Sequence, residues 1–139
     1  MTLKEFIKKY QDKTVDYDKA FGGQCVDLFN QYLVDVYKIN EPIREFPVAS
    51  AFQLFDMAKR KSNFVTQNNG LFDIAKEGDI IVWNQGVGPH GHVGICVKAG
   101  LMSLEVFEQN WNGVQKCVIN KHSYKHITGF FRLKKDARK

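Results

Sequence analysis

The order of the two kinds of apolar periodicity in this chain constrains its fold most strongly. Up to Lys61 the apolar residues recur at helical spacing, and after it they form short alternating or continuous runs typical of strands. Helices followed by strands favour an α+β domain over alternating βαβ units. With 139 residues, of which 44% are hydrophobic, the chain fits one domain with a real core. We expect that domain at residues 1–134, and the charged residues 135–139 as the start of a linker to a further module.

Three helices are predicted in the first part of the chain. Thr2 and Glu5 form an S/T-x-x-E capping box that begins a helix ending near Tyr10. Apolar residues at helical spacing predict a second helix from about Gln24 to Tyr37, with a cysteine at its start. Ser50 is expected to cap a third helix.

Five strands are predicted in the second part. They are expected at residues 79–83, 92–97, 103–108, 114–119 and 127–133. Their connections are short and contain glycine, which favours an antiparallel meander or a small open barrel.

Charge and composition exclude some functions and leave others open. The formal net charge of +5 favours anionic partners such as nucleic acid or cell-envelope polymers, but it also fits a solubilising surface. No stretch approaches the roughly 20 apolar residues that span a bilayer, and the first nine residues lack the apolar run of a secretory signal. Three cysteines without paired spacing predict neither a disulfide framework nor a C-x-x-C zinc site.

Cys25 is the candidate nucleophile. The start of a helix stabilises a thiolate, because unpaired N–H groups and the positive end of the helix dipole lie there. Gly22 and Gly23 allow a tight turn and access to the sulfur. Cys96 and Cys117 fall in predicted strands and are interpreted as buried small apolar residues. From position alone, a packing residue at the start of a helix is an equally good interpretation of Cys25.

A cysteine nucleophile needs a base, and the base needs an orienting group. Among the histidines, His122 and His126 lie in a polar stretch and are expected at the surface, whereas His90 is placed in a loop and His92 at the start of a strand. If residues 99–101 form a three-residue hairpin loop, His92 lies directly opposite Glu108, with Asn110 as its diagonal neighbour. A one-residue slip would abolish this arrangement, and polar residues at a solvated strand end are the alternative.

Four segments resemble the CHAP family of cysteine peptidoglycan hydrolases, which occurs in phage endolysins and bacterial autolysins. They occur in the family's order and span most of the chain: residues 23–28 (Gly-Gln-Cys-Val-Asp-Leu), 78–83 (Gly-Asp-Ile-Ile-Val-Trp), 91–95 (Gly-His-Val-Gly-Ile) and 108–111 (Glu-Gln-Asn-Trp). The resemblance implies a papain-like α+β fold, with N-terminal helices packed on a central antiparallel sheet of five or six strands. It also implies that Cys25 is the nucleophile, His92 the general base and then acid, and Glu108 the group that orients His92. Asn110 is then an accompanying polar residue of the site, and Gln24 a contact for the oxyanion.

The residues before and after Cys25 also repeat the ligand spacing of a calcium loop. Counting Asp16 as position 1, the offsets 3, 5, 7 and 12 fall on Asp18, Ala20, Gly22 and Asp27. Phe21 stands where an EF-hand has glycine, so a generic EF-hand is excluded, but some CHAP endolysins carry calcium at matching positions. We expect a structural Ca²⁺ and no organic cofactor; a solvated acidic loop is the alternative. Zinc at His90 and His92 is disfavoured, because further ligands with suitable spacing are lacking.

The sequence therefore predicts a monomeric enzyme that cleaves amide bonds in the peptide part of bacterial peptidoglycan. An endopeptidase is the first choice and an N-acetylmuramoyl-L-alanine amidase the second; a non-catalytic basic module that binds wall polymer or nucleic acid is the rival from another class. The preferred hypothesis includes neither a nucleic-acid partner nor membrane insertion. It describes a phage enzyme made without a signal peptide in the cytoplasm of a Gram-positive host, acting on the wall after release, with a possible C-terminal wall-binding module.

Overall fold

The computed structural model describes residues 1–20 and 22–135. Its helices are α1 (Leu3–Tyr10), α2 (Cys25–Asp35), α3 (Pro42–Glu45) and α4 (Leu54–Lys59), with short 3-10 turns η1 (Ala51–Gln53) and η2 (Gln85–Val87). Its strands are β1 (Phe64–Asn68), β2 (Ile80–Trp83), β3 (His92–Ala99), β4 (Ser103–Glu108), β5 (Val118–Ser123) and β6 (Ile127–Leu133). The capping box at Thr2 and Glu5 is present, and Cys25 is the first residue of α2. The predicted α+β class is confirmed.

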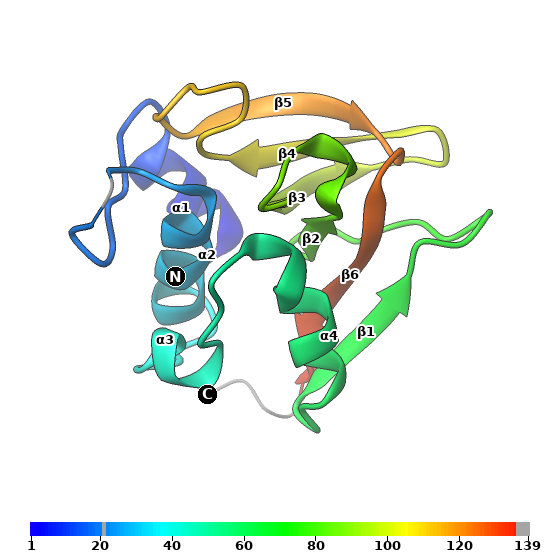
Figure 1. Cartoon of the computed structure of the whole chain (residues 1–139), viewed down its shortest axis with the longest axis horizontal. Coiled ribbons are helices and arrows are strands. Elements are labelled where there is room, and N and C mark those ends of the chain that lie inside the picture. The colour runs from blue at the N-terminus through cyan, green and yellow to red at the C-terminus, as the bar shows by residue number, and fades with distance from the viewer. Residues whose placement is uncertain (21, 136–139) are drawn as a thin grey trace.

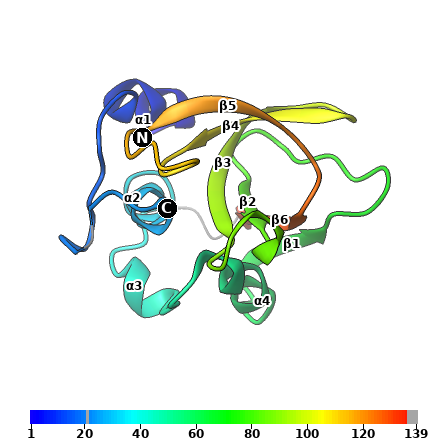
Figure 2. The ribbon, with the colours of Figure 1, turned by 45° about the horizontal axis from the view of Figure 1, so that its top comes forward.

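The six strands form one antiparallel sheet in the order β1-β6-β2-β3-β4-β5. Strands β2 to β5 form a meander, and β6 returns to lie between β1 and β2 (Figure 1). The sheet is strongly curved, with α1 and α2 beside its β3–β5 part and α4 beside β1 and β6 (Figure 2). None of the helices in the described ranges combines the length and the apolar character that a membrane crossing requires.

Alternation along the strands divides the core between the two faces of the sheet. Ile80 and Val82 pack with the helices in the larger cluster, which includes Leu28, Phe29 and Phe131. The neighbouring residues on β2, including Trp83, pack in a second cluster on the other face. Cys96 belongs to that second cluster, whereas Val93 and Ile95 belong to the first. The predicted faces of β3 are therefore confirmed, and His92 shares a face with Cys96.

The predicted strand at residues 114–119 is wrong by about four positions, because β5 begins only at Val118. A tight turn occupies the earlier residues: Asn110, Asn112 and Gly113 all have positive φ, and Trp111 bridges to Val114. Cys117 therefore precedes β5 rather than lying in it, although it is fully buried as expected. Edge strand β1 has no counterpart among the predicted strands, because its polar and half-buried residues lack a clear alternation. Of the predicted linker, residues 136–139 lie outside the described residues.

The assumed hairpin register between β3 and β4 is also wrong. Ile95 pairs with Phe107, whereas after a bulge near Lys98 the partner of Ala99 is Leu104. Continued along the strands, this register sets Glu108 opposite Gly94 and brings Asn110, rather than Glu108, opposite His92. The error at this end is two residues, so each side chain keeps its predicted face.

Candidate active site

Cys25 is the first residue of α2, and the loop before it is fixed by hydrogen bonds with Asp27 on the helix and Gln109 after β4. The Asp27 carboxylate accepts a hydrogen bond from the backbone N–H of Gln24 at 3.0 Å, which fixes the start of the helix. The Cys25 side chain is partly exposed, whereas Cys96 and Cys117 are buried, and burial raises the pKa of both buried thiols to about 12. Of the three thiols, only Cys25 is therefore accessible to a substrate.

Gln109, which directly follows β4, holds the loop before Cys25 against the sheet. Its side-chain amide is fully buried and bonds both backbone groups of Val15, at 2.7 Å each. The same amide nitrogen donates to the carbonyl of Gln24 at 2.8 Å. Since Gln24 precedes the nucleophile, this side chain fixes where α2 begins relative to the strand that carries Glu108.

His92 lies at the first position of β3 with only 3% of its surface exposed. Its Nε2 is 2.8 Å from Oε1 of Glu108, which leaves Nδ1 for Cys25. Burial lowers the pKa of His92, but hydrogen-bonding and charge interactions with Cys25 and Glu108 outweigh it and raise the pKa to about 9. The three residues named by the sequence are thus brought together, although the register that suggested their proximity was wrong.

Gly94 makes this diagonal contact possible. A Cβ at this position would clash with Cγ1 of Val106 and would lie 3.3 Å from the Cβ of Glu108, so β4 would have to shift. The missing side chain leaves space for the glutamate to lean toward His92.

Glu108 is completely buried, and its carboxylate contacts two further side chains besides His92. Its second oxygen, Oε2, accepts a hydrogen bond from Nδ2 of Asn120 at 2.8 Å and lies 2.6 Å from Nε2 of His122. The expectation that His122 is a surface residue is wrong, since its side chain is only 9% exposed. Both donors lie on β5, two residues apart and therefore on one face. If β5 had been predicted at its true position, the alternation of its side chains would have placed Asn120 and His122 on the face that meets Glu108. The strand predicted at residues 114–119 obscured this alternation.

Two indole rings enclose the imidazoles. Trp83 lies 5.1 Å from both His92 and His122, measured between ring centroids. Trp111 lies 5.0 Å from His92 and 4.6 Å from His122. The rings exclude water from the Glu108 carboxylate and restrict the orientation of both histidines.

Cys25 and His92 open into a common cleft of about 540 Å³. The cleft is lined by Gln24, Cys25, Val26, Ala49, Ser50, Ala51, Gly88, Pro89, His90, Gly91, His92 and Asn110. Gln24 and Asn110, both predicted from the sequence, thus lie beside the thiol and the imidazole. His90 lies in the loop at the rim, as expected, and its Nδ1 is 2.7 Å from the hydroxyl of Ser50.

The predicted metal ligands include three carboxylates that meet in space. One oxygen atom from each of Asp16, Asp18 and Asp27 lies within 4.8 Å of the others. Oδ1 of Asp16 is buried and has no hydrogen-bond partner among the described residues. Burial, followed by the charges of Asp18 and Asp16, raises the pKa of Asp27 to about 6. Crowded carboxylates with an unpartnered buried oxygen are the donor set expected for a hard cation, and Ala20 and Gly22 lie in the same loop.

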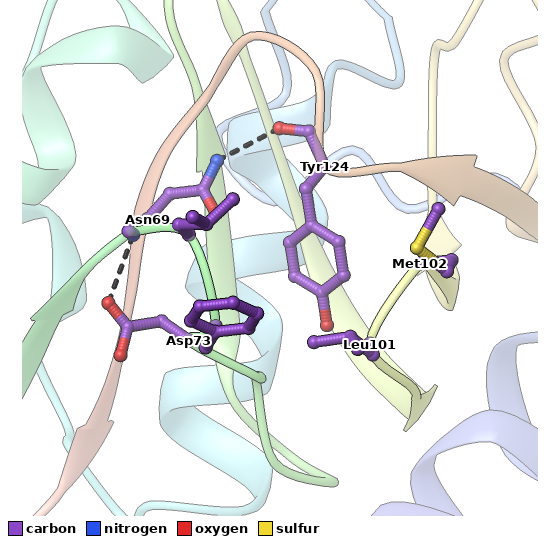
Figure 3. A pocket seen from close by; sticks show the side chains of 8 residues that line it. Asn69, Asp73, Leu101, Met102 and Tyr124 are labelled. Carbon is purple, nitrogen blue, oxygen red and sulfur yellow. Dashed lines mark hydrogen bonds between the residues drawn. The ribbon is translucent and has the colours of Figure 1, made fainter.

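A separate hollow of about 460 Å³ lies between the loop at residues 69–73 and the β3–β4 turn (Figure 3). Leu71, Phe72 and Met102 are strongly exposed there. Asn69 fastens the loop by donating to the backbone carbonyl of Tyr124 at 2.9 Å. With no cysteine or histidine in its lining, this hollow lacks the nucleophile and base that the Cys25 cleft contains.

A family model for the CHAP domain matches residues 14–110. The chain is 31% identical over 144 residues to endolysin PlyTW of Staphylococcus phage Twort, covering 94% of this chain but only 30% of that protein.

Two solved structures share the fold. The chain is similar to the wild-type endolysin LysIME-EF1, with a TM-score of 0.75, 22% identity and coverage of 93% of this chain and 61% of the other. It is also similar to Ly7917, with a TM-score of 0.67, 16% identity and coverage of 92% and 59%.

Proposed function

The chain belongs to the CHAP domain family, and on that premise we propose that it is a peptidoglycan hydrolase that cleaves amide bonds in the peptide part of bacterial cell walls. The observation that carries the proposal is the cleft in which the partly exposed thiol of Cys25 faces His92, whose other ring nitrogen is bonded to the buried Glu108. Nucleophile, base and orienting group in one line are the arrangement of a cysteine acyl-transfer site.

The proposed reaction proceeds through a thioester. The thiolate of Cys25 attacks the amide carbonyl, and the imidazolium of His92 gives its proton to the departing amine. Water then attacks the thioester carbonyl while His92 takes a proton from the water. The C–S bond breaks, which releases the carboxyl product and restores the Cys25 thiolate. Glu108 keeps Nε2 of the ring protonated and stabilises the imidazolium form.

The charge on the carbonyl oxygen needs donors during both steps. The proposed donors are backbone N–H groups at the start of α2, where Gln24, Cys25 and Val26 line the cleft, together with the Gln24 side chain. Asn110 lies across the cleft near His92 and is assigned a polar contact to the substrate backbone.

Replacing the nucleophile or the base tests the mechanism. We expect Cys25→Ser and His92→Ala each to reduce lysis of Gram-positive cell walls by at least about 10³-fold, because each removes a member of the reacting pair. Turbidity of purified walls measures the loss, and circular dichroism checks the fold. Cys96→Ala is the matched control, since Cys96 is buried in the sheet outside the cleft, and it should retain activity. Near-full activity of either site variant would overturn the mechanism.

Within this class we propose an endopeptidase in preference to an N-acetylmuramoyl-L-alanine amidase. Both reactions use the same three residues, so the rim of the cleft, including Pro89 and His90, decides which bond is presented. Mass spectrometry of digested peptidoglycan distinguishes them: an endopeptidase releases new peptide termini, whereas an amidase frees the lactyl group of the sugar from intact stem peptides. The second product pattern would reverse the assignment.

A non-catalytic basic module for wall polymer or nucleic acid is the competing function. It rests on the net charge of +5 and on exposed aromatic side chains such as Phe72. Treatment with a thiol alkylator distinguishes the enzyme from the binding module. For the enzyme, alkylation of Cys25 should abolish wall lysis. A binding module would lyse no walls before alkylation and would still bind them afterwards.

We also propose that Asp16, Asp18 and Asp27, with the backbone carbonyls of Ala20 and Gly22, hold a structural Ca²⁺. The crowded carboxylates and the unpartnered Oδ1 of Asp16 support this assignment. The ion would neutralise the carboxylates and rigidify the loop that leads into Cys25. It supplies no step of the reaction.

Calcium titration of chelator-treated protein tests the metal site. We expect Ca²⁺ to raise the melting temperature of the native chain and to leave that of Asp16→Asn unchanged. Asp56→Asn, an exposed carboxylate on α4, is the control and should respond as the native chain does. An unchanged melting temperature of the native chain in millimolar Ca²⁺ would exclude the site.

The chain spans about 30% of the length of the Twort endolysin. We propose that it acts as a monomeric catalytic domain in phage-induced lysis, on the wall of a Gram-positive host, beside a separate wall-binding module. A pull-down with purified walls, comparing this chain with the longer protein, would reveal that contribution to binding.

A further inference from the structure

The Glu108 carboxylate is shared by two imidazoles. Oε1 is bonded to Nε2 of His92 at 2.8 Å, and Oε2 to Nε2 of His122 at 2.6 Å. A catalytic dyad needs only the first contact. The second contact comes from β5, a strand that contributes nothing to the lining of the cleft.

The second oxygen of Glu108, Oε2, has hydrogen-bond partners of its own. Asn120 donates to the same Oε2 at 2.8 Å, so three side chains bond a carboxylate with no exposed surface. His122 packs edge-on against Trp83 and Trp111, the same indoles that enclose His92. The rotation of the His122 ring is therefore restricted, with its Nε2 aimed at Glu108.

We propose that His122 is a positioning residue for the reaction: with Asn120 it keeps the Glu108 carboxylate ionised and aimed at His92. The inference rests on the proposed function for its catalytic consequence, but the state of Glu108 can be measured without any substrate. His122 is not among the residues that line the cleft, and its hydrogen-bond contact with the site is to Glu108.

The electrostatics of Glu108 agree with this role. Burial raises the pKa of Glu108, but the hydrogen bonds from His122 and His92 and their charges outweigh it and hold that pKa below 4.5. The ionisable groups in contact with this carboxylate are His92 on β3 and His122 on β5, and Cys25 on α2 lies beyond His92. If the His122 donor is lost, burial remains and the pKa of Glu108 must rise.

His122→Phe is the informative variant, because it keeps an aromatic ring against both tryptophans and removes the donor. We expect the ¹³C signal of the Glu108 carboxyl to titrate below the ordinary range of a glutamate in the native chain and at higher pH in His122→Phe than in the native chain. His122→Gln restores an N–H donor and should return the titration toward the native value. His126→Asn is the matched control on an exposed turn and should leave it unchanged.

Wall-lysis kinetics give the second readout. In His122→Phe we expect kcat near pH 6 to fall about tenfold, equivalent to about 1.4 kcal/mol, with KM within about twofold, because the substrate cleft is untouched. The acidic limb of the pH profile should move to higher pH together with the Glu108 titration. A purely structural role would instead lower stability and leave that limb in place.

The outcomes separate this inference from the proposed function. An unchanged Glu108 titration in a folded His122→Phe would overturn the inference, whatever the enzyme hydrolyses. If the titration moves but the native chain lyses no walls, the proposed function fails and the role of His122 toward Glu108 stands. Should His122→Phe not fold, ¹⁵N spectra of the native histidines decide: a proton on Nε2 of His122 near neutral pH supports the contact, and its absence excludes it.

Discussion

At the scale of single residues, the protonation of His92 governs the reaction that we propose. Its pKa of about 9 means that the ring carries a positive charge at neutral pH and can protonate a leaving amine. Because that pKa is raised above the ordinary value of 6.5, the charge contributes fully to stability below about pH 6.5. The contribution is lost as the pH rises through about 9.

The pH dependence follows from this sign. We expect kcat for wall lysis to fall as the pH rises through about 9, because His92 loses the proton that it must donate. Glu108→Gln removes one of the interactions that raise this pKa, so the fall should move to lower pH by about one unit. Kinetic pH profiles of the two proteins provide the measurement.

Glu105→Gln is the control for this prediction. Glu105 lies on the same strand, but its side chain is exposed, so the variant should keep the native alkaline limb. An alkaline limb that does not move in Glu108→Gln would show that His92 is tuned by Cys25 alone.

At the scale of elements, the pair β3–β4 places base and orienting group diagonally rather than face to face. Gly94 lies between His92 and the bulge, opposite Glu108 in the continued register. The absence of a side chain there allows the diagonal hydrogen bond of 2.8 Å between His92 and Glu108. Strand geometry and site geometry therefore depend on the same glycine.

Gly94→Ala should damage both stability and activity. The new Cβ would clash with Cγ1 of Val106 and lie 3.3 Å from the Cβ of Glu108, so we expect about 1–3 kcal/mol of destabilisation and a large loss of lysis. Urea unfolding and wall turbidity measure the two effects. Gly100→Ala, where the nearest atom would be 3.6 Å away, should change neither by much. Equal behaviour of the two alanine variants would contradict the role of Gly94.

At the scale of the whole molecule, a buried ion pair fastens the middle of the sheet. The Asp79 carboxylate, 1% exposed just before β2, receives two hydrogen bonds from Arg132 on β6, at 2.5 and 2.6 Å. The backbone N–H of Lys76 donates to it as well. The hydrogen bonds to Asp79 raise the pKa of Arg132 above its ordinary value. The ion pair joins the start of the meander at β2 to the returning strand β6, two segments that lie far apart in the sequence.

Arg132→Met should cost about 3 kcal/mol of unfolding free energy, because it leaves a buried carboxylate without its partner. Urea unfolding measures the change. Arg44→Met on α3 removes an exposed ion pair with Glu41, the residue before that helix, and should cost less than about 1 kcal/mol of unfolding free energy. Similar costs for both variants would mean that the buried pair contributes no more than a surface one.

The sequence by itself determined the elements and the faces. Capping signals and periodicity predicted α1, α2, the segment of α4 and four of the strands, but not the short helix α3; they also gave the start of α2 at Cys25 and the shared face of His92, Gly94 and Cys96. They did so because side-chain direction is a local property of helix and strand geometry. At the His92 end the register error is two residues and preserves the faces, which is why the side-chain contact between His92 and Glu108 exists although the two residues are not directly opposed.

Only the tertiary structure decided the register, the edge strands and the surroundings of Glu108. The bulge near Lys98, the position of β1 and the start of β5 depend on how strands pair with one another, which the apolar pattern of a single strand does not encode. For the same reason His122 and Asn120 could not be assigned to the site before β5 was placed beside β4. Local geometry fixes which way a side chain points, and long-range packing fixes what it meets there.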